Sequence, residues 1–179
     1  MKRVIRAFLL AGTPFFSVAG AGGGGAPVSE LARPLLGLKG RAFDLAWLDA
    51  MRSQQEILAG LSEMQRLHGQ KPALKNWAAS DKEQRLARGE QLQALKNQLK
   101  PPTDVTHTDV VVAIANSSDK DLLTRFDPFF LSEYPKQVAQ STALARLALG
   151  RSTSAIIREE AAAVLAYETA RMNGLRKFK

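Results

Sequence analysis

The residues that most often carry chemistry are scarce in this chain of 179 residues. It has no cysteine and only two histidines, His68 and His107. The lack of cysteine excludes disulfides, thiolate zinc sites, c-type haem and cysteine nucleophiles. Neither histidine has a glutamate three residues before it, so the Glu-x-x-His motif of ferritin-type di-iron sites is absent. We therefore expect neither oxidase nor iron-storage chemistry.

Glutamates are the remaining candidates for acid–base chemistry. Those on the predicted helices include Glu56, Glu63, Glu90, Glu133, Glu159, Glu160 and Glu168. Such chemistry needs two carboxylates that face each other across a cleft, and solvated helix faces account for nearly all of these residues. The chain also lacks a Gly-x-Ser-x-Gly nucleophile motif and a Gly-Lys-Ser/Thr phosphate loop. We therefore predict no catalytic residue, no cofactor and no enzymatic activity.

Residues 1–21 have the pattern of an export signal. Lys2, Arg3 and Arg6 precede a short apolar run that ends in the small residues Ala19-Gly20-Ala21. The run is too short to span a bilayer, for which about 20 apolar residues are needed. We predict cleavage near residue 21 and a soluble protein of the periplasm or cell envelope, with an uncleaved anchor as the alternative.

The charge distribution bears on possible partners. Removing the export signal takes away three positive charges and no negative one, which lowers the formal net charge from +8 to +5. The remaining cations are spread out except for a C-terminal cluster of Arg171, Arg176, Lys177 and Lys179. A solvated helix end explains this cluster, since cations there complement the helix dipole. Nucleic-acid binding would call for a basic stripe with interleaved aromatics, so we expect no nucleic-acid partner.

Apolar spacing predicts long helices after a flexible leader at 22–40, which opens with four glycines. The first helix covers 41–67, with one apolar stripe at Trp47, Met51, Leu58 and Leu61. A turn at 69–72 precedes a second helical pattern, in which the polar stretch 78–82 suggests a bend, and Pro101-Pro102 ends it. Its apolar positions are Leu74, Trp77, Leu86, Leu92, Leu95 and Leu99.

A linker at 101–117 separates these helices from a second pair. Asp127, which is followed by proline, is expected to cap the third helix, and Pro135 should kink it. Ser152 or Ser154 should cap the last helix.

The two helical pairs repeat one another at a constant offset of 83 residues. The matching positions are Phe43-Asp44 with Phe126-Asp127, Leu48 with Leu131, Gln54 with Gln137, and Leu61 with Leu144. A constant offset indicates an internal repeat. Each unit, 41–100 and 118–179, is a helical hairpin that needs the other to bury its apolar faces. We therefore predict an all-α fold over 41–179, an up-and-down four-helix bundle made of two hairpins.

Residues 43–55 read Phe-Asp-Leu-Ala-Trp-Leu-Asp-Ala-Met-Arg-Ser-Gln-Gln, and 88–95 carry Gly-Glu-Gln-Leu. These runs resemble the first hairpin of a bacterial exported ferritin-like family, domain of unknown function 305. The helix ends at 144–149 and 168–172 are similar to its second hairpin. The resemblance implies a ferritin-like bundle and, because some members are linked to periplasmic copper, a site built from histidines and methionines.

The chain departs from that family where adjacent histidines are expected. It carries Gln54-Gln55 in the first half and Gln137-Val138 in the second. A neutral amide is a poor replacement for imidazole at copper, so we expect the metal site to be degenerate. Met51, Met172 and His68 are weak candidate ligands, because a lone methionine at helical spacing more often fills a core.

Gln54 and Gln137 occupy equivalent places in the repeat, in line with the apolar stripes of their helices. We predict that they form a buried polar pair, held by a Gln–Gln hydrogen bond or by a hydrogen bond from a glutamine to Tyr134 across the core. Rotation of both helices toward a solvated edge is the alternative.

Three functions remain open. The first, which the sequence favours, is an exported, non-enzymatic binding or structural protein with a degenerate metal site and a possible envelope partner. The second is a residual copper- or metal-binding protein of the periplasm. The third is a basic adaptor for anionic envelope polymers or lipid head groups, which would bind through the C-terminal cations in a salt-sensitive way.

Overall fold

The computed structural model describes residues 31–99 and 125–178, and within these ranges all regular structure is helical. The elements are η1 (Arg33–Gly37), α1 (Gly40–His68), α2 (Pro72–Leu99), α4 (Phe126–Arg151) and α5 (Ala155–Arg176). This confirms the all-α prediction. The export signal predicted at 1–21, the linker at 101–117 and His107 lie outside the described residues.

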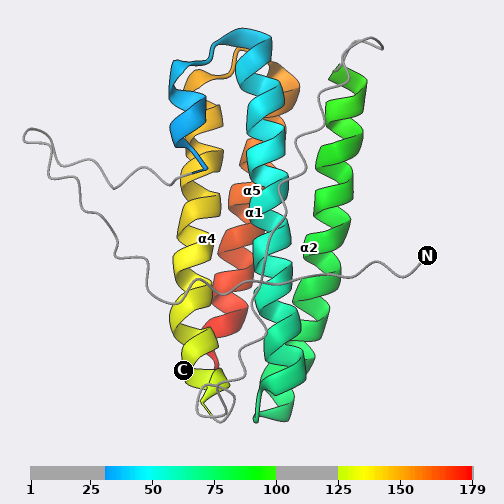
Figure 1. Ribbon diagram of the computed structural model, residues 1–179, viewed down its shortest axis with the longest axis vertical. Coiled ribbons are helices and arrows are strands. Elements are labelled where there is room, and N and C mark those ends of the chain that lie inside the picture. Colours follow the sequence, from blue (N-terminus) through cyan, green and yellow to red (C-terminus); the bar gives the residue numbers. More distant parts are fainter. Residues whose placement is uncertain (1–30, 100–124, 179) are drawn as a thin grey trace, which may run out of the picture.

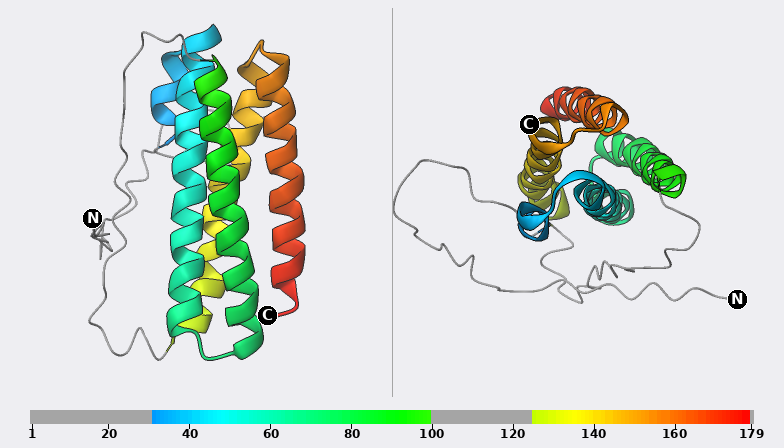
Figure 2. Two further views of the ribbon diagram at one scale, coloured as in Figure 1. Left: turned by 90° about the vertical axis from the view of Figure 1, so that its right-hand side faces the viewer. Right: turned by 90° about the horizontal axis from the view of Figure 1, so that it is seen from above.

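The four long helices pack as two hairpins, α1 with α2 and α4 with α5, and α1 also packs on α4 (Figure 1). The indole Nε1 of Trp47 donates to the carbonyl of Leu144 at 2.8 Å near one end of the bundle. At the other end, the rings of His68 and Phe126 lie 6.0 Å apart. The helices α1 and α4 are therefore antiparallel, and α2 and α4 run in the same direction (Figure 2).

This topology corrects the prediction of an up-and-down bundle, in which consecutive helices alternate in direction. The helix α2 ends at the top of the bundle in Figure 1, whereas α4 begins at the base. Periodicity within helices fixes which face is apolar but not their direction. With residues 100–125 separating the two helices, the chain was free to start α4 at either end.

The two hairpins are equivalent in register. An offset of 83 residues carries Pro72, the first residue of α2, onto Ala155, the first residue of α5. Each hairpin also anchors to the interhelical turn of the other through an equivalent aspartate. Asp44 accepts a hydrogen bond from the hydroxyl of Ser152 at 2.6 Å, and Asp127 accepts one from the backbone N–H of Lys71 at 2.9 Å.

Two helix starts differ in how they are capped. Asp127 was expected to cap α4, but α4 begins at Phe126, and no side chain caps it. Asp127 instead binds the turn of the first hairpin, because its carboxylate faces the backbone N–H groups there. The hydroxyl of Ser154 accepts from the N–H of Ile157 at 3.5 Å, which confirms the predicted cap of α5.

The described part of the leader, residues 31–40, is not a flexible tether. The helix η1 packs on the bundle through Leu35, which is 1% exposed. The guanidinium of Arg151 donates to the carbonyl groups of Leu36 and Leu38 at 2.9 and 3.1 Å. The flexible leader was predicted from the four glycines at 22–25. Residues 31–40 follow those glycines in the chain, and they are held by the burial of Leu35 and by the hydrogen bonds from Arg151.

The core consists of two apolar clusters stacked along the bundle. The upper cluster includes Phe43, Trp47, Leu92, Leu144 and Ile157. The lower one includes Leu58, Leu74, Phe126, Phe130 and Leu175. On α2, which runs unbroken through 78–82, the buried positions are Leu74, Ala78, Asp81, Arg85, Gly89 and Leu92, while Leu86 is 41% exposed. The buried face of α2 thus carries the charged residues Asp81 and Arg85, whereas Leu86, one of the predicted apolar positions, is exposed.

Candidate functional site

Arg85 lies at the centre of the bundle and is wholly buried. Its guanidinium donates to Gln55 Oε1 at 2.7 Å and to the Tyr134 hydroxyl at 2.7 Å. It also donates to both carboxylate oxygens of Glu168, at 2.6 and 2.7 Å, in the bidentate geometry that favours arginine over lysine. Since Gln55, Arg85, Tyr134 and Glu168 belong to α1, α2, α4 and α5, one side chain ties all four helices together.

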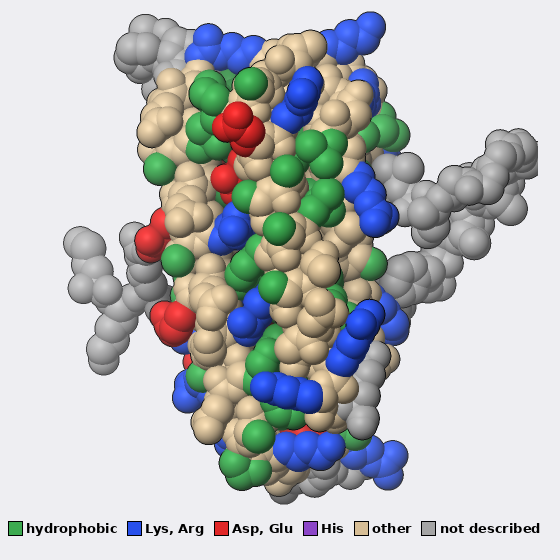
Figure 3. All heavy atoms as spheres, turned by 180° about the vertical axis from the view of Figure 1, so that it is seen from behind, with side chains coloured by type: hydrophobic (Ala, Val, Ile, Leu, Met, Phe, Trp, Pro, Cys, Tyr) green, Lys and Arg blue, Asp and Glu red, His purple; other side chains and the backbone are tan. Residues whose placement is uncertain are grey.

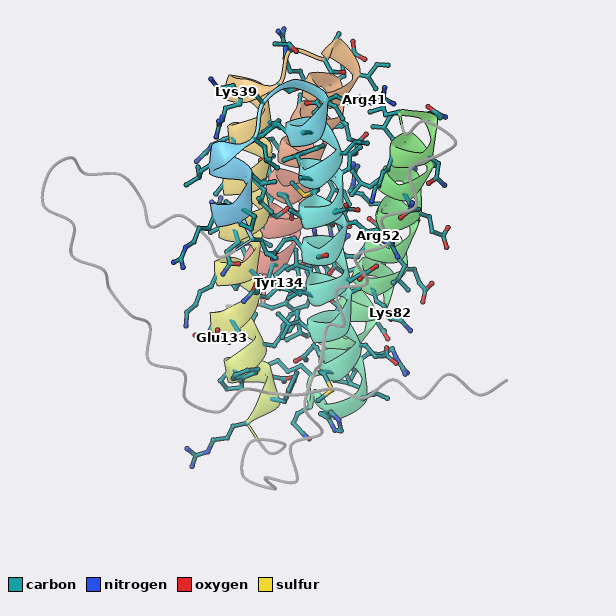
Figure 4. The ribbon with its side chains drawn as sticks, turned by 45° about the horizontal axis from the view of Figure 1, so that its top comes forward. Lys39, Arg41, Arg52, Lys82, Glu133 and Tyr134 are labelled. Carbon is teal, nitrogen blue, oxygen red and sulfur yellow. The ribbon has the colours of Figure 1, made fainter. Side chains whose placement is uncertain are left out.

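Asp81, one helical turn before Arg85, extends this network toward the base. Its Oδ2 accepts hydrogen bonds from the hydroxyls of Tyr134 and Ser62 at 2.7 and 2.6 Å. Its Oδ1 accepts from Arg171 Nε at 2.7 Å and lies 3.5 Å from Arg85 Nε. Figure 4 labels Tyr134, which lies between the helices and joins the two carboxylate centres.

Glu168 has further donors on its other side. Oε1 accepts from the Ser141 hydroxyl at 2.6 Å and from Gln55 Nε2 at 3.3 Å, in addition to Arg85. The thioether of Met51 lies 3.6 Å from both Gln55 Nε2 and Ser141 Oγ, and it closes the network against the upper apolar cluster. Both oxygens of this carboxylate are therefore occupied by protein donors.

The network is electrically balanced, with Arg85 and Arg171 opposite Asp81 and Glu168. Burial by itself lowers the pKa of Arg85, but the hydrogen bonds and charge of Glu168 raise that pKa well above its usual range. Burial raises the pKa of Tyr134 well above its ordinary value. The shifts therefore favour the charged form of the arginine and the neutral, donating form of the tyrosine.

A second tyrosine borders the network without a polar partner. The ring of Tyr167 lies 4.9 Å from the Arg85 guanidinium and 4.8 Å from that of Arg88, so two cations flank it. Burial raises the pKa of Tyr167 to about 12. Its buried hydroxyl has no hydrogen-bond partner among the described residues. It contributes its ring rather than its hydroxyl to the site.

The chemistry open to this arrangement is restricted. A metal ion would need the carboxylate oxygens that now accept hydrogen bonds from Arg85, and the fixed charge of the guanidinium repels a cation at that point. A general acid or base would need a carboxylate with a free face and access for substrate. Each carboxylate here is buried and bonded on both oxygens. The residues present therefore fit an internal ion pair and do not fit a metal centre or an acid–base pair.

The candidate ligands from the sequence are not brought together. Met51 lies beside Gln55 and Ser141, whereas Met172 packs against the lower apolar cluster. His68 lies at the C-terminal end of α1, against the ring of Phe126. Within residues 31–99 and 125–178, no three His, Asp or Glu side chains are grouped as a metal site.

Gln54 and Gln137 meet between α1 and α4. The Nε2 of Gln54 donates to the backbone carbonyl of Gln137 at 3.0 Å and to its Oε1 at 3.2 Å. Gln54 is wholly buried and its Oε1 has no partner among the described residues, whereas Gln137 is half-buried. The contact joins residues of the two hairpins at the repeat offset of 83, which is also the separation of Arg85 and Glu168.

Sequence reasoning missed most of the network. It assigned Glu168 to a solvated helix face, yet Glu168 is 1% exposed, and it did not single out Asp81 or Arg85. One signal was present: the offset that pairs Gln54 with Gln137 also pairs Arg85 with Glu168. Opposite charges at equivalent places of a repeat would have indicated this ion pair.

Comparison with known proteins adds no further constraint, because no protein-family description, curated protein or solved structure matches the chain. None of the helices in the described residues is both long and apolar enough to cross a membrane.

Proposed function

We propose that this protein is an exported, non-enzymatic binding or structural protein of ferritin-like architecture, in which an arginine of the chain itself fills the interior cation site. One observation carries the proposal: the Arg85 guanidinium binds both oxygens of the buried Glu168 and touches residues of the other two helices. A protein cation held in this way supplies the counter-charge that a bound ion would otherwise provide.

The arrangement of the helices supports the ferritin-like part of the proposal. Bundles with one long crossover between two hairpins include the ferritin-like folds. Here α2 and α4 run in the same direction, and the hairpins share a register offset by 83 residues. The fold alone implies no function, so the assignment of a non-enzymatic role rests on the interior side chains.

The positions at which the resemblance implies histidines support the same conclusion. Gln54 is bound to Gln137, and both polar atoms of Gln55 have partners: Oε1 accepts from Arg85, and Nε2 donates to Glu168 and to Ser141. Gln55 and Arg85 therefore bind each other where the resemblance implies metal-binding histidines, and we infer that this pair replaces those ligands.

Export rests on the charged start, short apolar run and small residues of the first 21 positions. The test is to express the full chain in a bacterial host and purify it from the periplasm. We expect an intact mass that begins near residue 22 and far less than one transition metal per chain. Recovery of the protein only from the cytoplasm would contradict export, a mass that retains residues 1–21 would contradict cleavage, and one tightly held copper or zinc ion per chain would contradict the filled site.

A matched pair of variants separates the arginine from general charge effects in this test. Arg88, one turn after Arg85 on α2, pairs with Glu160 at 2.8 Å on the partly exposed side. Arg85→Ala opens the interior site, whereas Arg88→Ala removes the same charge outside it. Arg85 is present in both wild type and Arg88→Ala. Stoichiometric metal in either protein would therefore show that Arg85 does not exclude metal from the interior.

A further inference from the structure

The base of the bundle, formed by residues 64–77, 125–129 and 171–178, is a basic surface. Four exposed cations lie there, Lys71, Arg125, Arg176 and Lys177, and Lys75 is half-buried beside them. None of the five has an ion-pair partner within the described residues. In Figure 3, basic side chains are visible near this lower end and also near the upper end of the bundle.

The acidic residues near the base do not offset these cations. Glu63 is engaged by Arg66 and Lys82, at 2.7 and 3.3 Å. Asp127 is buried and accepts hydrogen bonds from Gln65 and from the turn after α1. The described part of the base therefore presents one sign of charge to its surroundings.

Apolar side chains are interleaved with the cations. An open, shallow cleft of about 720 Å³ lies between α2 and the end of α5, lined by Ala73, Asn76, Trp77, Lys177 and Phe178. Gly174 allows the indole to approach α5, since a Cβ there would lie 3.0 Å from Trp77 Nε1. Leu67, at the end of α1, is 49% exposed. The base thus combines three apolar side chains, those of Trp77, Phe178 and Leu67, with the five cations named above.

We propose that the base is a docking surface for an anionic lipid bilayer. Charge complementarity places the cations against lipid phosphates, where each is worth about tenfold or less in affinity. The aromatic and aliphatic side chains then enter the boundary between head groups and acyl chains, as amphipathic aromatics do at membrane interfaces. A soluble polyanion would use the cations alone and leave Leu67 and Phe178 without a role.

This inference goes beyond the proposed function and does not depend on the filled interior, because none of the five cations named above belongs to the Arg85 network. The opposite end of the bundle supplies an internal control. Exposed cations lie there too, among them Lys39, Arg41, Arg146 and Arg158, together with the exposed carboxylate of Glu159. Neutralising Arg146 and Arg158 changes the net charge as much as neutralising two cations of the base, but away from the proposed docking surface.

The experiment is co-sedimentation of the mature chain with vesicles of phosphatidylcholine, with and without phosphatidylglycerol. We expect binding only to the anionic vesicles, and less of it as salt is added. Neutralising Arg176 and Lys177 to glutamine should weaken partitioning roughly 30-fold, since each cation near an anionic surface contributes about a factor of five. The matched variant with Arg146→Gln and Arg158→Gln should lose no more than about threefold.

Tryptophan emission distinguishes docking by the base from binding by charge alone. Trp77 is partly exposed, whereas Trp47 is wholly buried, so vesicle binding should shift only the Trp77 emission to shorter wavelength. The shift should be lost in Trp77→Phe. The proposal is overturned if anionic vesicles do not bind, or if the two double variants weaken binding equally. It is also overturned if Leu67→Ser binds vesicles as tightly as wild type while dextran sulfate in solution competes fully, because the base would then be a polyanion site.

Discussion

Arg85 and Glu168 occupy equivalent positions of the two hairpins, 83 residues apart, yet they carry opposite charges and bind each other through two hydrogen bonds of 2.6 and 2.7 Å. Equivalent residues can touch only near the axis that relates the two hairpins. Two identical charges would repel at this point, so the pair makes the hairpins different where they meet. Gln54 and Gln137 make the corresponding contact between α1 and α4 with identical side chains.

The first prediction concerns the Arg85–Glu168 pair. Arg85→Met leaves the Glu168 carboxylate buried without its cation and should lower the free energy of unfolding by about 3–5 kcal/mol. Adding Glu168→Met should recover most of this loss, because Asp81 keeps Arg171, Tyr134 and Ser62. Urea denaturation of both single variants and the double variant measures the coupling. Strictly additive effects would show that the two residues do not act as a pair.

Arg88→Met is the control for that cycle. Arg88 pairs with Glu160, and both side chains are partly exposed, so the loss should stay within about 1 kcal/mol. A loss as large as that of Arg85→Met would mean that any arginine on α2 matters equally and that burial is not the cause.

The second prediction compares two buried tyrosines. The Tyr134 hydroxyl donates to Asp81 and accepts from Arg85, so Tyr134→Phe should cost roughly 1–3 kcal/mol. The Tyr167 hydroxyl has no partner among the described residues, so Tyr167→Phe should be neutral or slightly stabilising. Thermal unfolding of the two variants gives the comparison. Equal losses would contradict the assignment of Tyr134 as the link between the carboxylates.

The third prediction is a pH dependence at the turn between α1 and α2. Burial acts to raise the pKa of Asp127, but hydrogen bonds from Gln65 and from the N–H groups of Gln70 and Lys71 outweigh it and lower the pKa below its ordinary value. The stabilisation is therefore complete above the unfolded value and is lost as pH falls through the folded one. The stability difference between wild type and Asp127→Asn should shrink with acidification between about pH 6 and pH 2. A difference that stays constant over this range would rule out a charged Asp127 as the anchor.

The fourth prediction concerns Gln54 and Gln137. Gln137→Leu removes one acceptor but leaves its backbone carbonyl bonded to Gln54, so it should cost no more than about 1 kcal/mol. Gln54→Leu together with Gln137→Leu removes both amides, including the unpaired Gln54 Oε1, and should be neutral or stabilising. Denaturant melts of the single and double variants test this. A double variant less stable than the sum of the singles would contradict it.

The sequence predicted the helices well because amphipathic spacing and turn residues are local signals. The predicted first helix at 41–67 is observed at Gly40–His68, and the predicted turn at 69–72 is observed at 69–71, because Pro72 already begins α2. The cap at Ser154 could also be predicted from the sequence, because serine is a preferred residue at the N-cap of a helix. Helix direction in the second hairpin was not, because no local pattern encodes it.

The interior site escaped prediction for a different reason. Charged residues are rarely buried unless they are paired, so Arg85 and Asp81 in a polar stretch of α2 suggested solvent. Their partners, Glu168 and Arg171, lie on α5. Only the packing of the two hairpins brings these side chains together, and that packing is set by the apolar clusters above and below them.

The central claim is that Arg85 fills the interior cation site, and isothermal titration of metal-free wild-type protein with copper(II) and zinc(II) tests it most directly. We predict no stoichiometric binding heat, because the oxygens of Glu168 and Asp81 are held by protein donors. One ion bound per wild-type chain, with binding lost in both Glu168→Gln and Asp81→Asn, would contradict the account.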